Sequence, residues 1–563
     1  MATPGQFALR SQRLGSLPIV NFFLARIGLA DHLATYLPHD DARLRLAPAA
    51  VIEVVVRNIV AGHRPVYALG EWAVPYDPAV LGLGPGDAEL LNDDRTGRTL
   101  GRLFDADRAS LITKTVLAVI RAFDVETAQL HNDSTTVTVT GNYPDADGRD
   151  RGGKATPAIR HGHNKDYRPD LKQLLFILTI SADGAVPVAY RVADGNTPDD
   201  ITHIPTWDQL HALVGHARFL YVADSNLCSK QAMGHIASHG GRFVTIVPHG
   251  RREDTWFRDW AQTHAPVWAE ARRVPGSRLG DPDRVWRTFE APAPSVDGYR
   301  VIWAHSSTKA ARDAATRAAR IEAGLAAIDA VATRLASPKT RIKTRVAAEE
   351  AATTALTGAG ATRWVGFTIT AASDVSFHQE RRGRPGTATR YRRAEKPVFT
   401  ITAAIRADNV AYDAATDGCF PLITNDTVMT PAEVLAAYRY QPNLERRNHM
   451  LKGPQEVAPV YLETPHRIEA LLLCHFLAML TEALIERAIR TSMKTEGLTG
   501  IPLYPELRNC PTPSAPRILE IFDDVQRHQL ISQDQIVQTF KPQLTPLQQQ
   551  VLDLLHIPAS VYT

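Results

Sequence analysis

The order of strands and helices between residues 128 and 247 constrains the fold of this chain more than any other sequence feature. Three stretches rich in β-branched and large apolar residues come first, and two further strands then alternate with two helices. The first helix follows the capping sequence Asn196 to Asp200 and runs to about Val214; the second lies near Ser229 to His239. The predicted strands are Leu130 to Thr140, Gln173 to Ile180, Val186 to Val192, Ala217 to Ala223 and Arg242 to Val247. A mixed sheet flanked by helices buries these faces economically, so the sequence predicts an α/β fold of order βββαβαβ.

The rest of the 563 residues changes texture at several points, which predicts more than one domain. Apolar helices separated by Pro and Gly precede the core, and a stretch of Pro- and Arg-rich loops around a helical hairpin interrupts it. The predicted regions are a helical DNA-binding or dimerisation region (1–125), the first part of the core (126–249), an α/β insertion with the hairpin and a basic strip (250–395), the second part of the core (396–495), and a helical C-terminal region (496–563).

Composition excludes several classes of protein. Hydrophobic residues make up 44% and charged residues 22% of the chain. These are ordinary globular values, which argue against a mainly disordered chain or a coiled rod. The 63 basic and 60 acidic residues leave a net charge of only +3, so any surface that binds nucleic acid must be local. Cys228, Cys419, Cys474 and Cys510 stand far apart without a CxxC pair, which favours buried thiols over disulfides or a zinc site.

One apolar run has the length of a membrane span. Ile468 to Ile485 carries Glu469, His475 and Glu482 within it, and we therefore interpret it as a buried helix. The first thirty residues lack the uninterrupted apolar segment of a secretory signal. We expect a cytoplasmic protein without a membrane partner.

Three carboxylates could converge on one site. Asp133 lies in the first strand, Asp224 directly follows the fourth, and Glu445 lies on a helical stretch from Tyr438 to Lys452. Hard divalent cations prefer oxygen ligands, and two such ions can activate an attacking oxygen and stabilise a leaving oxygen in phosphoryl transfer. Taken singly, an Asp at a strand end is more often a turn residue, and a Glu on a polar helix is more often solvated.

Two basic segments are candidates for DNA contact. The stretch His378 to Lys396 contains Arg382, Arg384, Arg392 and Arg393, and its Arg-Gly-Arg-Pro sequence resembles the core of an AT-hook, a minor-groove reader. A solvated loop is the alternative. Lys165 and Arg168 lie in a polar loop beside His161 and His163, for which DNA contact is a better interpretation than metal binding. The N-terminal helices could also include a helix-turn-helix reader.

As a set, these motifs resemble the DDE transposases of bacterial insertion sequences, in the insertion-sequence-four-like branch with the YREK signature. Tyr438, Glu445 and Lys452 keep the spacing of that signature, whereas Gln441 occupies the Arg position, with Arg446 close by. The blocks at 162–173, 417–426 and 451–472 also resemble that group, as does an insertion before the Glu helix.

The resemblance implies an RNase H-like mixed sheet core interrupted by the insertion, with helical N- and C-terminal parts. It implies a two-metal Mg²⁺ site at Asp133, Asp224 and Glu445, with Mn²⁺ as a plausible substitute. It further implies cleavage of double-stranded DNA at terminal inverted repeats and joining to target DNA by a synaptic homodimer, associated with the nucleoid when bound. Tyr438, Gln441, Arg446 and Lys452 would grip the terminal DNA.

Two other functions stay open on the sequence. One is an RNase H-like metal-dependent nuclease that cuts DNA without joining strands. The other is a DNA-binding protein derived from a transposase whose catalytic site is inactive.

Overall fold

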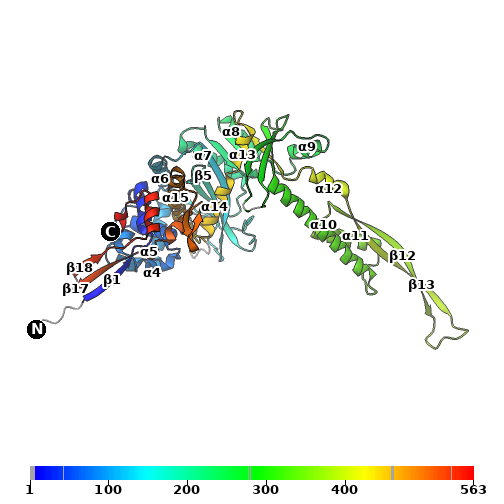
Figure 1. Ribbon diagram of the computed structural model, residues 1–563. Helices are drawn as coiled ribbons and strands as arrows, with labels where there is room; N and C mark the ends of the chain where they lie inside the picture. Colours follow the sequence, from blue (N-terminus) through cyan, green and yellow to red (C-terminus); the bar gives the residue numbers. More distant parts are fainter. Residues whose placement is uncertain (1–6, 42, 277, 279, 458–461, 534) are drawn as a thin grey trace. The chain divides into compact units, whose positions relative to one another are not determined.

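The computed structural model describes residues 7–41, 43–276, 278, 280–457, 462–533 and 535–563 (Figure 1). The chain divides into two compact units. Unit 1 comprises the chain up to Thr245 and from Ala436 onward, and unit 2 comprises Ile246 to Leu435. Each unit is described by itself below.

The sheet of unit 1 contains the five strands expected from the sequence. They are β2 (Gln129–Val139), β5 (Lys172–Ser181), β6 (Pro187–Asp194), β7 (Leu220–Ala223) and β8 (Arg242–Ile246), in the spatial order β6-β5-β2-β7-β8. The β6-β5 and β5-β2 pairs are antiparallel, whereas β2-β7 and β7-β8 are parallel. Helices α7 (His203–Val214) and α8 (Lys230–Ser238) connect the last strands, which confirms the predicted mixed α/β order.

Helices from both ends of the chain complete unit 1. The N-terminal helices are α1 (Leu17–Ile27), α2 (Leu29–Tyr36), α3 (Pro48–Ala61), α4 (Leu69–Ala73), α5 (Asp93–Asp105) and α6 (Arg108–Phe123), and the C-terminal ones are α14 (Gln441–Lys452), α15 (Pro465–Thr495), α16 (Ala515–Glu520) and α17 (Pro546–Leu554). The centre is α15, which contacts α3, α5 and β6.

Among the described helices, only α15 has by itself the length and apolarity of a membrane span, and the bent pair α1 and α2 reaches that size only if taken together. Of the most apolar window of α15, 94% is buried inside the protein, as expected for a core helix. All four cysteines are buried and free.

The C-terminal region is not purely helical, which corrects the sequence prediction. Strands β15 (Ile501–Tyr504) and β16 (Arg508–Cys510) form a hairpin, and β17 (Gln526–Ser532) pairs with β18 (Gln535–Phe540) and with the N-terminal strand β1 (Phe7–Arg13). These strands contain many Gln, Arg and Ser residues and leave most side chains partly exposed. Their apolar alternation is therefore weak, and pairing across more than 500 residues has no local signal.

Unit 2 has its own antiparallel strands. In the spatial order β14-β11-β10-β9 they are β14 (Cys419–Thr424), β11 (Arg300–Ser306), β10 (Arg284–Glu290) and β9 (Ala269–Val274). Helix α9 (Arg252–Trp260) covers them, with the ring of Phe257 stacked on that of Trp303 at 3.7 Å between centroids. Helix α12 (Ala407–Ala414) precedes β14, and α13 (Pro431–Tyr438) follows it.

The predicted helical hairpin of the insertion is present in unit 2. Helix α10 (Ser307–Ala336) starts where the Ser306 side chain accepts a hydrogen bond from the Lys309 amide, and α11 (Arg345–Gly358) starts at Thr344 in the same way. Ile328, Val331 and Leu335 of α10 are buried against Ala352 and Leu356 of α11. The apolar side chains of the two helices therefore hold the hairpin together.

A long two-stranded ribbon extends from this hairpin. Strands β12 (Val365–Gln379) and β13 (Tyr391–Ile405) pair in continuous antiparallel register from Val365↔Ile405 to Gln379↔Tyr391 (Figure 1). Near its base, Ile369 and Ile401 are buried against α10 and α11. The sequence predicts strands only at this base, from Trp364 to Thr370 and from Pro397 to Ile405, because the outer part lacks apolar alternation and is rich in charged residues.

Candidate active site

Asp133 and Asp224 lie at matching positions of two adjacent parallel strands of unit 1. Asn132 of β2 pairs with Ala223 of β7, so the next residue of each strand is one of the two aspartates. The Asp224 side chain caps the turn after β7, because Oδ1 accepts from the Asn226 amide and Oδ2 from Asn226 Nδ2, both at 3.0 Å. The parallel register thus brings together the first two residues that the sequence predicts for the site.

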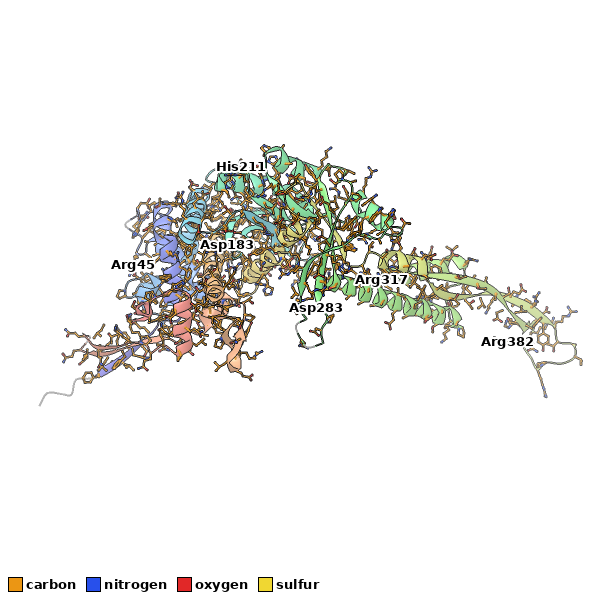
Figure 2. All side chains as sticks on the ribbon, turned by 45° about the horizontal axis from the view of Figure 1, so that its top comes forward. Arg45, Asp183, His211, Asp283, Arg317 and Arg382 are labelled. Carbon is orange, nitrogen blue, oxygen red and sulfur yellow. The ribbon has the colours of Figure 1, made fainter. Side chains whose placement is uncertain are left out.

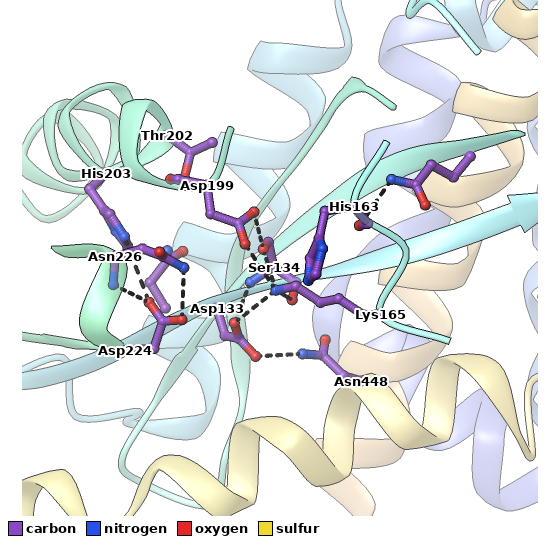
Figure 3. Close-up of polar contacts among 12 residues, drawn as sticks. Asp133, Ser134, His163, Lys165, Asp199, Thr202, His203, Asp224, Asn226 and Asn448 are labelled. Atoms are coloured by element: carbon purple, nitrogen blue, oxygen red, sulfur yellow. Dashed lines mark hydrogen bonds and ion pairs between the residues drawn. The ribbon is translucent and has the colours of Figure 1, made fainter. Parts of the chain in front are cut away.

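A third aspartate, Asp199, joins them through Lys165 (Figure 3). The Lys165 ammonium lies 3.2 Å from Asp199 Oδ2 and 3.6 Å from Asp133 Oδ1. It also donates to the carbonyl of Ser134 at 2.6 Å and to its hydroxyl at 2.8 Å, and that hydroxyl donates to Asp199 Oδ1 at 2.7 Å. We call Asp133, Asp199 and Asp224 the carboxylate cluster.

The electrostatics of the cluster follow from burial and like charge. Burial, with the negative charge of Asp224, raises the pKa of Asp133 to about 6, although Lys165 acts in the opposite direction. Burial also raises the pKa of Asp224. Burial of Lys165 acts to lower its pKa, but the negative charges of Asp133, Asp199 and Asp224 raise it overall. The ionised forms of Asp133 and Asp224 are therefore less favourable here than in water, and a cation beside them stabilises those forms.

Helix α14 closes the site beside β2. Asn448 Nδ2 donates to Asp133 Oδ2 at 3.3 Å (Figure 3). Arg447, which is almost fully buried, forms an ion pair with Glu486 of α15 at 2.9 Å and donates to the carbonyls of Gly184 and Ala185. This buried pair fixes the rotation of α14, on which Glu445 is exposed.

The Tyr438 phenol lies within the electrostatic influence of Glu445 and of the two strand aspartates. Burial and the negative charges of Asp224, Glu445 and Asp133 together raise the pKa of its phenol. The break between α13 and α14 falls between Tyr438 and Gln441, at the point where Pro442 opens the new helix. Tyr438 and Glu445 therefore lie on separate helices.

The structure gives Gln441 a different role from the predicted DNA contact. It is 7% exposed, its Nε2 donates to the carbonyl of Asn132 at 3.1 Å, and its Oε1 lies 2.8 Å from His131 Nδ1. Since an amide oxygen can only accept, Nδ1 of His131 carries the hydrogen. Burial lowers the pKa of His131 to about 4, so this ring is neutral. Gln441 fastens α14 to β2 where a charged Arg would meet a neutral, buried imidazole.

The other predicted DNA contacts of unit 1 divide into two groups. Lys165 serves the carboxylate cluster, and Lys452 pairs with Asp166 at 2.5 Å. Arg168 and Arg446 are exposed, and both branches of the Arg168 guanidinium bind Asp170. Of these residues, Lys165 departs most from the prediction, because its loop folds back against β2.

Sequence reasoning missed Asp199 and His203. Asp199 was assigned to helix capping, and His203, the first residue of α7, carried no motif. The buried His203 ring places Nε2 4.0 Å from Asp224 Oδ1 and Nδ1 3.1 Å from the Tyr221 hydroxyl. Burial lowers its pKa to about 4. Their signal was present as two polar residues at the start of a helix that follows β6.

In the described part of the chain, no three His, Cys, Asp or Glu side chains lie close enough to hold one metal ion as they stand. The donor chemistry nevertheless fits a hard cation, since the carboxylate cluster offers only oxygen ligands and Lys165 already supplies a positive charge there. The Mg²⁺ site at Asp133, Asp224 and Glu445 stays a prediction.

The predicted basic strip lies on the ribbon of unit 2. Arg382, which lies on the connecting loop (Figure 2), and Arg384, Arg392 and Arg393 are all exposed. Arg393 forms an ion pair with Glu395 on its own strand. The interpretation as an unstructured loop holds for 380–390 only.

Comparison with known proteins gives limited matches. Residues 9–117 match a protein family described as a domain of unknown function, DUF4277. The search of curated proteins gave no match. Among solved structures, a piggyBac transposase synaptic complex with hairpin DNA aligns with 91% of this chain and 81% of that chain, at 8% sequence identity and a TM-score of 0.38. A likeness at that TM-score carries no conclusion about this chain.

Proposed function

We propose that the chain is a DDE transposase that cleaves the ends of a DNA element and joins them to target DNA by cut-and-paste transfer. The observation that carries the proposal is that Asp133, within β2, and Asp224, directly after the parallel strand β7, occupy neighbouring positions of the sheet, and that the charge of Glu445 acts on the same Tyr438 phenol as theirs. The strand order β6-β5-β2-β7-β8, antiparallel in its first three strands and parallel in the rest, supports an RNase H-like core.

Asp133, Asp224 and Glu445 would hold Mg²⁺ or Mn²⁺. When bound, such ions activate an attacking oxygen and stabilise the leaving oxygen of a phosphodiester. Asn448 orients Asp133 through its amide, and the buried pair of Arg447 and Glu486 keeps α14 in place. Lys165 offsets part of the negative charge of the carboxylate cluster, and its ammonium would have to move away from Asp133 or share that carboxylate with a bound cation.

Lys452 supports the DNA side of this proposal. Its partner Asp166 also accepts a hydrogen bond from the Thr136 hydroxyl at 3.3 Å, so Asp166 links the end of α14 to β2. A phosphate can replace Asp166 as the partner of the ammonium, because both are anionic oxygen acceptors. We infer that Lys452, with the exposed Arg446, contacts the terminal DNA of each element end in a homodimeric complex.

A strand-transfer assay tests the function. DNA flanking the gene supplies the inverted repeats; precut ends with a free 3′-hydroxyl are mixed with the full chain, a target plasmid and Mg²⁺. Joined products support the transposase. Cleavage of uncut ends without joining identifies the nuclease, and neither reaction despite normal end binding identifies the inactive DNA-binding protein.

A further inference from the structure

The outer part of the ribbon in unit 2 is built in a way that the packing of its own unit does not explain. We call residues 372–398 the distal ribbon. Inward of it, the pairs Ile369↔Ile401 and Ala371↔Phe399 place Ile369, Ile401 and Phe399 against the helical hairpin. Outward of Thr370, most side chains on both faces are exposed. An isolated two-stranded hairpin is marginally stable in water, so a long exposed one suits a surface that a partner covers.

The distal ribbon carries exposed apolar and basic side chains beside one another. Val375, Phe377 and Tyr391 lie on one face and are 39%, 64% and 50% exposed, and the same face carries Glu395 and Arg393, which pair with Val375 and Phe377. The opposite face carries the pair His378↔Arg392 and the pair Asp374↔Lys396. Exposed aromatic side chains beside arginines match a nucleic-acid groove, whose floor and sugar edges are partly apolar and whose walls are phosphates.

The connecting loop concentrates positive charge further. Between His378 and Lys396 there are seven Arg or Lys residues and two Glu residues. Arg382, Gly383, Arg384 and Pro385 occupy the exposed turn (Figure 2), and hydrogen bonds between Gly386 and Thr389 close it. Two arginines separated by one glycine form a narrow cationic tip, which suits the narrow and strongly negative minor groove of A·T-rich DNA.

From these observations we propose that the distal ribbon is a DNA-binding arm that inserts its loop arginines into the minor groove of A·T-rich duplex DNA, with Phe377 and Tyr391 against the sugar edges. The inference deepens the proposed function by naming a second DNA contact outside the catalytic residues. It rests on that function only in taking DNA as the partner, and binding is measurable without cleavage.

The test uses the full chain with Mg²⁺ chelated and fluorescent duplexes of equal length, one A·T-rich, one G·C-rich and one of A-form RNA. Fluorescence anisotropy across a salt series gives the affinity and its salt slope. The double variant Arg382→Ala/Arg384→Ala removes the tip. The matched control Arg341→Ala/Lys343→Ala removes the same charge from an exposed loop of the same unit.

We expect the tip variant to lose roughly tenfold in affinity for the A·T-rich duplex, and its salt slope to fall by about 0.9 per lost contact. Phe377→Ala should weaken the same duplex less, and the control should match the wild type. An equal loss on all three nucleic acids, or no loss, overturns the proposal. If the wild-type chain binds through its arm but cleaves nothing when Mg²⁺ is supplied, only the proposed function is refuted.

Discussion

The carboxylate cluster of unit 1 and the distal ribbon of unit 2 both gather charge of one sign, but they handle it in opposite ways. In the cluster, Asp133 is surrounded by donors from Lys165 and Asn448, and burial shifts its pKa. In the ribbon, the arginines lie in water at the end of a thin hairpin. Buried like charges cost free energy unless a cation joins them, whereas exposed like charges cost little until a polyanion binds. The first arrangement is suited to chemistry and the second to binding.

The comparison predicts its largest stability effect at the buried ion pair that supports the cluster. Arg447→Met removes the almost fully buried partner of Glu486 and leaves it only the partly exposed Arg490, at 3.2 Å, so the free energy of unfolding should fall by about 3 kcal/mol. The control is Arg345→Ala in unit 2, whose pair with Glu349 is exposed and should contribute no more than about 0.5 kcal/mol. Denaturant titration measures both, and equal effects would break the distinction between buried and exposed charge.

A smaller effect is expected where the cluster depends on its own cation. Lys165→Met removes a hydrogen-bonded charge from between Asp133 and Asp199, which should lower the stability of the metal-free protein by about 1.5–3 kcal/mol at pH 8. Mg²⁺ should then raise the Tm of the variant more than that of the wild type, because it replaces the missing charge. Thermal unfolding with and without Mg²⁺ checks this. If Mg²⁺ raises the Tm of both proteins equally, Lys165 does not occupy the place of a metal ion.

The two ends of α14 sharpen the comparison within unit 1. Gln441→Ala leaves buried polar atoms of β2 without a partner, and it should cost about 1–3 kcal/mol in unfolding free energy. Lys452→Ala breaks a partly exposed pair and should cost less than about 1 kcal/mol, yet it should impair end processing more once the stability difference is corrected. Assays of both variants on precut and uncut transposon ends measure the two processing defects. A larger processing defect in folded Gln441→Ala than in Lys452→Ala would indicate that Gln441 contacts DNA.

The smallest effect is expected on the ribbon. Phe377→Ala changes a large apolar side chain that is 64% exposed, so it should alter the free energy of unfolding by no more than about 0.5 kcal/mol. Denaturant titration of the full chain gives the value. A loss above about 2 kcal/mol, typical of a buried aromatic, would mean that the ribbon is a packed structural element instead of an exposed arm.

The sequence predicted the core well because its strands are buried and carry strong local signals. β5 is apolar from Leu174 to Leu178, and β2 is rich in Thr and Val, so the positions and order of these strands could be predicted. The strand positions alone did not single out Asp133 and Asp224, because an Asp there is more often a turn residue; the resemblance to the DDE transposases selected them as a set.

What the sequence did not reveal depends on contacts without a local pattern. The pairing of β1 with β17 and the full length of the ribbon could not be predicted, because these strands are polar and exposed. Such strands lack the alternation of apolar and polar residues that burial of one face imposes. Asp199 and Lys165 meet only after two loops fold back toward β2. Gln441 was assigned to DNA contact from the spacing of the signature, but it is buried against His131, a tertiary contact that no local pattern predicts.

Mg²⁺-dependent nicking of the flanking DNA by carboxylate variants tests the central claim most directly. Asp133→Ala, Asp224→Ala and Glu445→Ala should each nick at least about a thousandfold more slowly, because each removes a proposed ligand of the metal ions that stabilise the reacting phosphodiester oxygens. DNA-end binding, measured by anisotropy, should stay near the wild-type value. Asp94→Ala, at an exposed carboxylate paired with Arg98 in the same unit, should nick normally. Normal Mg²⁺-dependent nicking by folded Asp224→Ala would contradict the account.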